Sequence, residues 1–201
     1  MNVSTAAPAL AQPLVLGDLL PRTRVRDAAL VTGGALLTIL GAQISIHVPP
    51  SPVPITGQTL AVVIAGAALG ARRGALSQLL YLALGLLLPV YADGAHGLDV
   101  VFGATGGYLI GFVLAAYVVG LLAERGADRQ PLVAFAAFCL GQLCIFGIGV
   151  PWLKVSTGMD WSTAIHDGFT IFIVGGLIKA FAAGALTPCA WWLVRRVERP
   201  D

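Results

Sequence analysis

Long apolar runs, separated by short polar stretches, extend along the chain from about residue 28 onward. This pattern predicts six membrane-crossing spans, at about 28–46, 55–71, 74–90, 100–123, 132–153 and 168–194. Each run is close to the ~20 residues that cross roughly 30 Å of hydrocarbon. Because the runs are continuously apolar and do not alternate between inward and outward positions, they favour helices over a membrane barrel. The pattern is therefore typical of an all-α integral membrane protein with six transmembrane helices.

The composition agrees with a location in the lipid bilayer. Of the 201 residues, 57% are hydrophobic and only 11% are charged, too few charges for the surface of a soluble domain of this size. The net charge of +2 is spread along the chain, which argues against nucleic acid as a partner. The three cysteines lie inside apolar runs without metal-ligand spacing, so we predict buried thiols, no metal site and no cofactor.

The arginines indicate the orientation of the chain. With six spans all of them fall on one side, and a count of five or seven spans would mix them. They are Arg22, Arg24, Arg26, Arg72, Arg73, Arg125, Arg129, Arg195, Arg196 and Arg199. By the positive-inside rule that side is cytoplasmic, and so are both termini. We expect residues 1–22 to form a flexible or surface-lying cytoplasmic tail, and residues 23–199 to form one six-helix domain.

A proline-rich stretch lies between the first two spans, at residues 48–59. Four prolines within six residues remove backbone donors and fix φ, which excludes both helix and central strand. The hydrogen-bonding side chains of Thr56, Gln58 and Thr59 follow directly. The stretch is either a stiff rim over a small polar site or a rigid connector between two membrane helices.

Small residues recur at the four-residue spacing that lets helices pack closely in lipid. Two sets of glycines have this spacing, Gly66–Gly70–Gly74 and Gly103–Gly107–Gly111, the second along one face of the fourth span. In the first span, Ala28, Ala29, Thr32 and Gly33 form another small face near the cytoplasm. That face serves either internal packing or a partner helix.

Lys179 is the one ionisable side chain deep inside a predicted span. It lies about eleven residues, or roughly 16 Å, from the outer end of the sixth span. A lysine at mid-bilayer costs about 2.5 to 3.5 kcal/mol on insertion scales, so we expect it to face a cavity. There an ammonium group is a natural counter-ion for a ligand carboxylate. The alternative is a lysine that snorkels or caps a helix end.

Several sequence motifs of enzymes are missing. No G-x-x-x-x-G-K-[ST] loop is present, so the chain is not the ATP-hydrolysing unit of a pump. Neither H-E-x-x-H nor G-x-S-x-G occurs, which removes the basis for a metalloprotease or a serine hydrolase. We therefore expect a binding or transport protein, not an enzyme, with a polar pocket near its outer face.

Three motifs resemble the BioY family, the biotin-specific S components of energy-coupling factor (ECF) vitamin transporters. They are Gly41-Ala-Gln-Ile-Ser-Ile-His-Val-Pro-Pro-Ser-Pro-Val-Pro-Ile-Thr-Gly-Gln-Thr-Leu60, Leu69-Gly-Ala-Arg-Arg-Gly-Ala75 and Phe102-Gly-Ala-Thr-Gly-Gly-Tyr-Leu-Ile-Gly-Phe112, with Ala104 where the family usually has proline. The resemblance implies a six-helix fold in the cell membrane that binds biotin near the outer face beneath the first loop. It also implies partners, a transmembrane coupling protein and two cytoplasmic ATPases.

The chain departs from the family pattern next to the deep lysine. The family usually reads P-G-D-L-I-K, whereas this chain reads Val174-Gly-Gly-Leu-Ile-Lys179. Gly176 replaces the acid, so Lys179 has no partner on its own helical face, and Asp167 lies too far out to substitute. The result is a pocket of net positive charge, which predicts either tighter carboxylate binding or altered selectivity or weakened transport.

If the ligand is biotin, its three chemical groups need three kinds of side chain to bind them. The candidates are Gln58, Thr105, His96 and Gln43 for the ureido ring, Tyr81, Tyr108 and Trp152 for the thiophane ring, and Lys179 for the carboxylate. Polar groups in a bundle also bond neighbouring helices, and a loop histidine is often simply solvated. Two rival functions stay open, an S component for another small vitamin, and a solitary carrier or structural membrane protein without ATPase partners.

Overall fold

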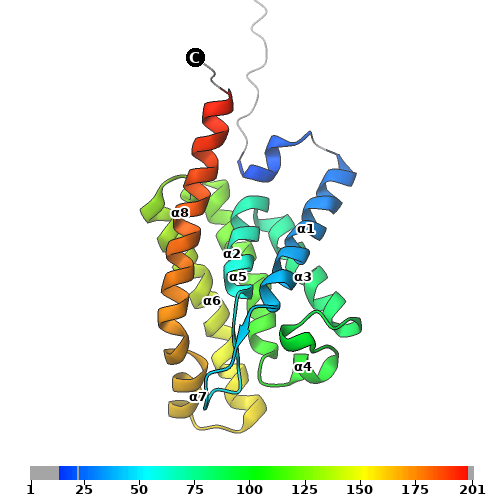
Figure 1. The fold of residues 1–201 in the computed structure, drawn as a ribbon, viewed down its shortest axis with the longest axis vertical. Coiled ribbons are helices and arrows are strands. Elements are labelled where there is room, and N and C mark those ends of the chain that lie inside the picture. Colours follow the sequence, from blue (N-terminus) through cyan, green and yellow to red (C-terminus); the bar gives the residue numbers. More distant parts are fainter. Residues whose placement is uncertain (1–13, 22, 199–201) are drawn as a thin grey trace, which may run out of the picture.

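The computed structural model describes residues 14–21 and 23–198, which form a helical bundle with one short hairpin (Figure 1). Its elements, with η for 3-10 helices, are η1 (Leu16–Leu19), α1 (Arg24–Ala42), β1 (Ser45–Ile46), β2 (Ile55–Thr56), α2 (Gln58–Leu69), α3 (Ala71–Leu87), η2 (Ala92–Gly94), α4 (Leu98–Phe102), α5 (Gly106–Glu124), η3 (Ala127–Arg129), α6 (Pro131–Thr157), α7 (Trp161–Gly168), η4 (Thr170–Phe172) and α8 (Ile173–Glu198). The all-helical membrane fold predicted from the apolar runs is confirmed.

Five helical stretches within the described residues are long and apolar enough to cross a membrane. The second predicted span, at about 55–71, is the exception: its helix α2 has 12 residues and reaches only about 18 Å. It is short because the polar hairpin precedes it, and because Gly70, with φ of 82°, ends it in a conformation that disfavours other residues. Helix α2 is thus enclosed by α1, α3, α5 and α8, which contact it on several sides.

Two of the predicted spans are interrupted near the same end of the bundle. The fourth span breaks between α4 and α5, and the sixth breaks between α7 and α8. Gly103 follows the end of α4 and adopts extended backbone, so the prediction that it shares one helical face with Gly107 and Gly111 is wrong. Both breaks lie beside the cavity described below, where helix ends bring backbone and polar groups inward.

The remaining glycines allow the close helix packing that their spacing predicts. A Cβ atom at Gly111 would stand 2.9 Å from the Cα of Ile145 on α6. At Gly66 it would stand 2.6 Å from the carbonyl oxygen of Ala116 on α5. Helices α2, α5 and α6 therefore pack backbone to backbone, and the centre of the bundle is dense.

The described arginines gather at one end of the molecule, with the start of α1 and the end of α8 (Figure 1). There Arg73 at the start of α3 forms ion pairs with Asp18, at 2.6 Å, and with Asp27, at 3.3 Å. Asp18 belongs to η1, so the described end of the predicted tail packs on the bundle. Residues 1–13 and 22 of that tail lie outside the described residues. The hairpin, α4 and α7 lie toward the opposite end, which the arginines predict to be the outer one and which we call the outer end (Figure 1).

Candidate functional site

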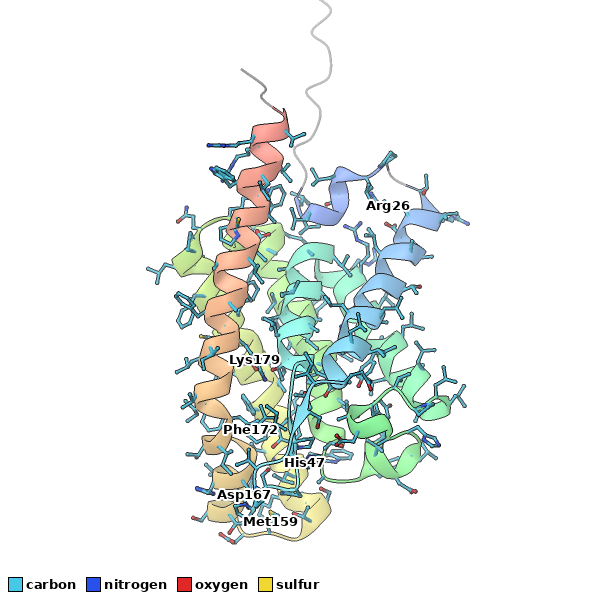
Figure 2. The ribbon with its side chains drawn as sticks, in the orientation of Figure 1. Arg26, His47, Met159, Asp167, Phe172 and Lys179 are labelled. Carbon is cyan, nitrogen blue, oxygen red and sulfur yellow. The ribbon has the colours of Figure 1, made fainter. Side chains whose placement is uncertain are left out.

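A cavity of about 310 Å³ opens at the outer end of the bundle. Its walls come from the first loop, α2, the segment around η2, α4, α5, α6 and α8. In Figure 2 the labelled residues Lys179, Phe172 and His47 lie at successive levels, from the middle of the bundle toward the outer end. The cavity therefore extends from the outer loops toward the middle of the bundle.

The proline-rich loop covers one side of this cavity. Its two arms pair as the antiparallel strands β1 and β2, with Ser45 opposite Thr56. Pro52, Val53 and Pro54 line the cavity, so the loop is a rim and not only a connector.

Two contacts hold the rim to distant parts of the chain. The Ser51 hydroxyl donates a hydrogen bond to the backbone carbonyl of Asp167 on α7, at 2.7 Å. On the other side, His47 Nε2 lies 3.3 Å from the Asp93 carboxylate in η2. The rim is thus attached at two points, and the exposed His47–Asp93 contact is the weaker because water screens it.

Lys179 reaches from α8 toward the inner end of the rim. Its ammonium group donates to the backbone carbonyl of Thr56, at 2.6 Å, and to the Thr59 hydroxyl, at 3.1 Å. The prediction that this lysine faces a cavity is confirmed, because it lines the cavity together with both residues. An ammonium group has three donors, so these two bonds leave one N–H for a ligand.

A fixed amide lies next to this cation. Gln58, at the start of α2, accepts a hydrogen bond from the Thr56 hydroxyl at 2.8 Å and donates one to the Tyr81 hydroxyl at 2.5 Å. Gln58 lines the cavity, but Tyr81 is fully buried behind it and does not. Tyr81 therefore holds Gln58 in place from behind, a role that sequence reasoning did not separate from direct contact.

An aromatic wall faces the polar groups. Tyr108 on α5 stands with its ring centroid 6.2 Å from that of Phe146 and 6.5 Å from that of Phe172. The Tyr108 hydroxyl donates to the carbonyl of Gly168 at 2.9 Å, which fixes the ring against the break before α8. Thr105 also lines the cavity, and its hydroxyl donates to the carbonyl of Val100 at 3.3 Å.

Besides Tyr81, three predicted residues do not line the cavity. Gln43 is exposed, and its amide bonds the carbonyl of Ile39 at 3.2 Å. His96 is exposed in its loop. Trp152 donates from its indole N–H to the carbonyl of Gly103 at 2.9 Å and so braces the break between α4 and α5.

Sequence reasoning also missed residues that do line the cavity. They are His47, Asp93, Asp99, Phe112, Gln142, Phe146 and Phe172. The sequence carried one usable signal for this set: Gln142 is an uncharged polar residue in the middle of the fifth predicted span. The phenylalanines carry no signal, because aromatic residues are common on every face of a membrane helix.

The departure at Gly176 lies within the cavity wall. Gly176 lines the cavity, and a Cβ atom placed on it would meet nothing within 4 Å. Asp167 is buried and contacts His166 Nδ1 at 2.7 Å instead of the lysine. Among the described residues no carboxylate forms an ion pair with Lys179, so the cavity keeps the unpaired cation that the sequence predicts.

The small face of α1 lies at the other end of the molecule. Its residues, Ala28, Ala29, Thr32 and Gly33, are all exposed. A Cβ atom at Gly33 would meet nothing within 4 Å, whereas one at the neighbouring Gly34 would stand 2.8 Å from the Ser77 Cβ. Of the two interpretations, internal packing is therefore wrong for these four residues, and the partner helix stays a prediction.

Comparisons with known proteins place the chain in a family. A model of the BioY family matches residues 11–196. The chain is 38% identical over 152 residues to the biotin transporter BioY2 of Lactococcus lactis subsp. cremoris, which covers 74% of this chain and 80% of that protein. It is 36% identical over 160 residues to the biotin transporter BioY of Rhizobium etli, which covers 76% and 85%. A crystal structure of the S-component for biotin from an ECF-type ABC transporter superposes with a TM-score of 0.75 at 25% identity, covering 85% of this chain and 94% of that one.

Proposed function

Because the chain belongs to the BioY family, we propose that it is the biotin-binding S component of an ECF transporter. It would capture biotin at the outer face of the cell membrane, which it crosses several times, and deliver it inward. The chain has no ATP-binding loop of its own, so the energy for transport would come from a partner.

The observation that carries this proposal is the combination of groups around one cavity. Lys179 offers a cation, Gln58 offers an amide, and Tyr108 with its two phenylalanine neighbours offers an apolar wall. Biotin has a carboxylate, a ureido group and a thiophane ring, and each finds its counterpart here. A cavity of about 310 Å³, lined by apolar side chains with polar ones among them, suits a ligand of this size.

We assign a role to each predicted residue from its position. Lys179 binds the carboxylate, Gln58 and Thr105 bond the ureido ring, and Tyr108 packs against the thiophane ring. Tyr81 acts through Gln58, to which it is hydrogen bonded. Gln43 and His96 would contact biotin only if the outer loops moved, because neither lines the cavity.

The partners would be a transmembrane coupling protein and two cytoplasmic ATPases. The exposed face of Ala28, Ala29, Thr32 and Gly33 supports this part of the proposal, because small exposed residues let a second helix approach closely in lipid. The face lies toward the arginine-rich end, where the ATPases would be, and away from the cavity. Binding and coupling would therefore use opposite ends of the chain.

The proposal is tested by measuring the binding of radiolabelled biotin to the chain purified alone in detergent. We expect saturable binding that unlabelled biotin abolishes and that other small vitamins do not. Competition by another vitamin in place of biotin would give the S component a different ligand. Biotin uptake by cells that lack the coupling protein and the ATPases would instead point to a solitary carrier.

A further inference from the structure

Gln142 is a buried polar side chain that lacks a partner in the protein. Its side chain is 6% exposed, and neither its amide nitrogen nor its amide oxygen has a hydrogen-bond partner among the described residues. Gln78, another buried glutamine, differs: its nitrogen donates to Ser77 Oγ at 3.0 Å, and its oxygen accepts from Thr38 Oγ1 at 3.2 Å. Buried amide groups are nearly always hydrogen bonded, so an unbonded Gln142 amide needs an explanation.

The position of Gln142 provides one, because it lines the biotin cavity. It lies on α6, which packs against α8 at Gly184, where an added Cβ atom would stand 3.2 Å from the Phe135 Cα. On α6, Gln142 lies seven residues after Phe135, about 10 Å along the helix at 1.5 Å per residue. On α8, Gly176 lies eight residues before Gly184, about 12 Å in the same direction. Gln142 therefore lies at the level of Gly176, which adds no side chain to that part of the cavity.

The chemistry of a primary amide restricts what can satisfy it. A glutamine side chain offers N–H donors and a carbonyl acceptor side by side. A carboxylate only accepts, so it would leave the Gln142 oxygen without a donor. The edge of a cyclic urea, in which an N–H adjoins a C=O, satisfies both atoms at once.

We propose that Gln142 binds the ureido edge of the ligand through a pair of hydrogen bonds and so makes the cavity specific for a cyclic urea. This inference rests on the proposed function and adds a residue to it. In this assignment Lys179 binds the carboxylate of the ligand and Gln142 binds its ureido group. The unbonded amide destabilises the ligand-free protein, and a ligand that bonds both of its polar atoms removes this penalty.

The test replaces Gln142 with methionine, which has nearly the same length but no hydrogen-bonding amide. Two neutral hydrogen bonds correspond to about a five- to hundredfold loss of affinity for biotin. An analogue whose ureido oxygen is replaced by sulfur, a weaker acceptor, should bind the native chain less tightly than biotin but lose little more on the variant. That non-additivity is the mark of a direct contact.

Thermal unfolding without ligand separates a binding role from a structural one. Gln142→Met should melt at the native temperature or above it, because it removes unpaired buried polar atoms, whereas the matched variant Gln78→Met should melt lower. Gln142→Leu serves as a second apolar variant with the same expectation. Loss of stability in both Gln142 variants, or biotin affinity equal to that of the native chain, would overturn the assignment. A native chain that fails to bind biotin would overturn the proposed function, and the assignment with it.

Discussion

The Lys179 ammonium group bonds the backbone carbonyl of Thr56 at 2.6 Å, across 123 positions of sequence. Thr56 ends β2, the inner arm of the rim, and Lys179 lies on α8 in the cavity wall. The cation that we assign to the ligand carboxylate therefore also holds the rim. Because its third N–H remains for the ligand carboxylate, the same ammonium group would bind the ligand and hold the rim.

The first prediction concerns topology and follows from the arginines. A reporter fused after Asp201 should be active in the cytoplasm, and one inserted near His96 should be active outside. The measurement is the activity of a paired set of reporters that each work on only one side of the membrane. An external signal from the C-terminal fusion would contradict the six-span orientation.

The second prediction concerns coupling and uses two adjacent glycines. Gly33→Leu should abolish energised biotin uptake but leave biotin binding by the purified chain intact, because Gly33 is exposed and distant from the cavity. Gly34→Leu is the matched control: it would collide with Ser77 and should lower the thermal stability of the chain itself. Normal uptake by the Gly33 variant would show that this face does not meet the coupling protein.

Much of the fold was predictable, because lipid requires every spanning segment to be both apolar and helical. The break at Gly103 was not, because the residues before it are as apolar as those in the spans. Before Phe169 the polar residues His166 and Asp167 indicated a boundary, but not the helix α7 that contains them. What ends these helices is tertiary: the Trp152 indole bonds the Gly103 carbonyl, and the Tyr108 hydroxyl bonds the Gly168 carbonyl. No local pattern encodes such contacts.

Part of the candidate site was predictable, because a polar side chain inside an apolar span is rare and stands out. Lys179 and Gln58 stood out for that reason, and both line the cavity. Tyr81 and Gln43 are polar as well, but which side of a helix faces a cavity depends on how its neighbours pack. Tyr81 points to the back of Gln58, and Gln43 bonds its own helix.

The third prediction concerns the acid that Gly176 replaces. Gly176→Asp would fit, because nothing lies within 4 Å of its Cβ position, and its carboxylate would stand on the same helical face as Lys179. It should lower the affinity for biotin, since it neutralises the cation and repels the ligand carboxylate. Gly176→Asn, of the same shape without the charge, should change affinity much less. Equal losses in both variants, measured by equilibrium binding, would mean that space and not charge governs this position.

The last prediction is that Lys179 and the biotin carboxylate form a direct charge pair. In a partly desolvated cavity such a charge-assisted hydrogen bond contributes roughly 1.5 to 3 kcal/mol, so Lys179→Met should weaken biotin binding about ten- to hundredfold. The variant also loses the bonds to Thr56 and Thr59, and Thr59→Val, which removes one of them and keeps the charge, measures how much that matters. A biotin amide, without a carboxylate, should bind the native chain less tightly than biotin does and lose little more on Lys179→Met. If Lys179→Met and the replacement of the carboxylate by an amide weaken binding independently, Lys179 does not contact the carboxylate. Its role is then only to hold the rim.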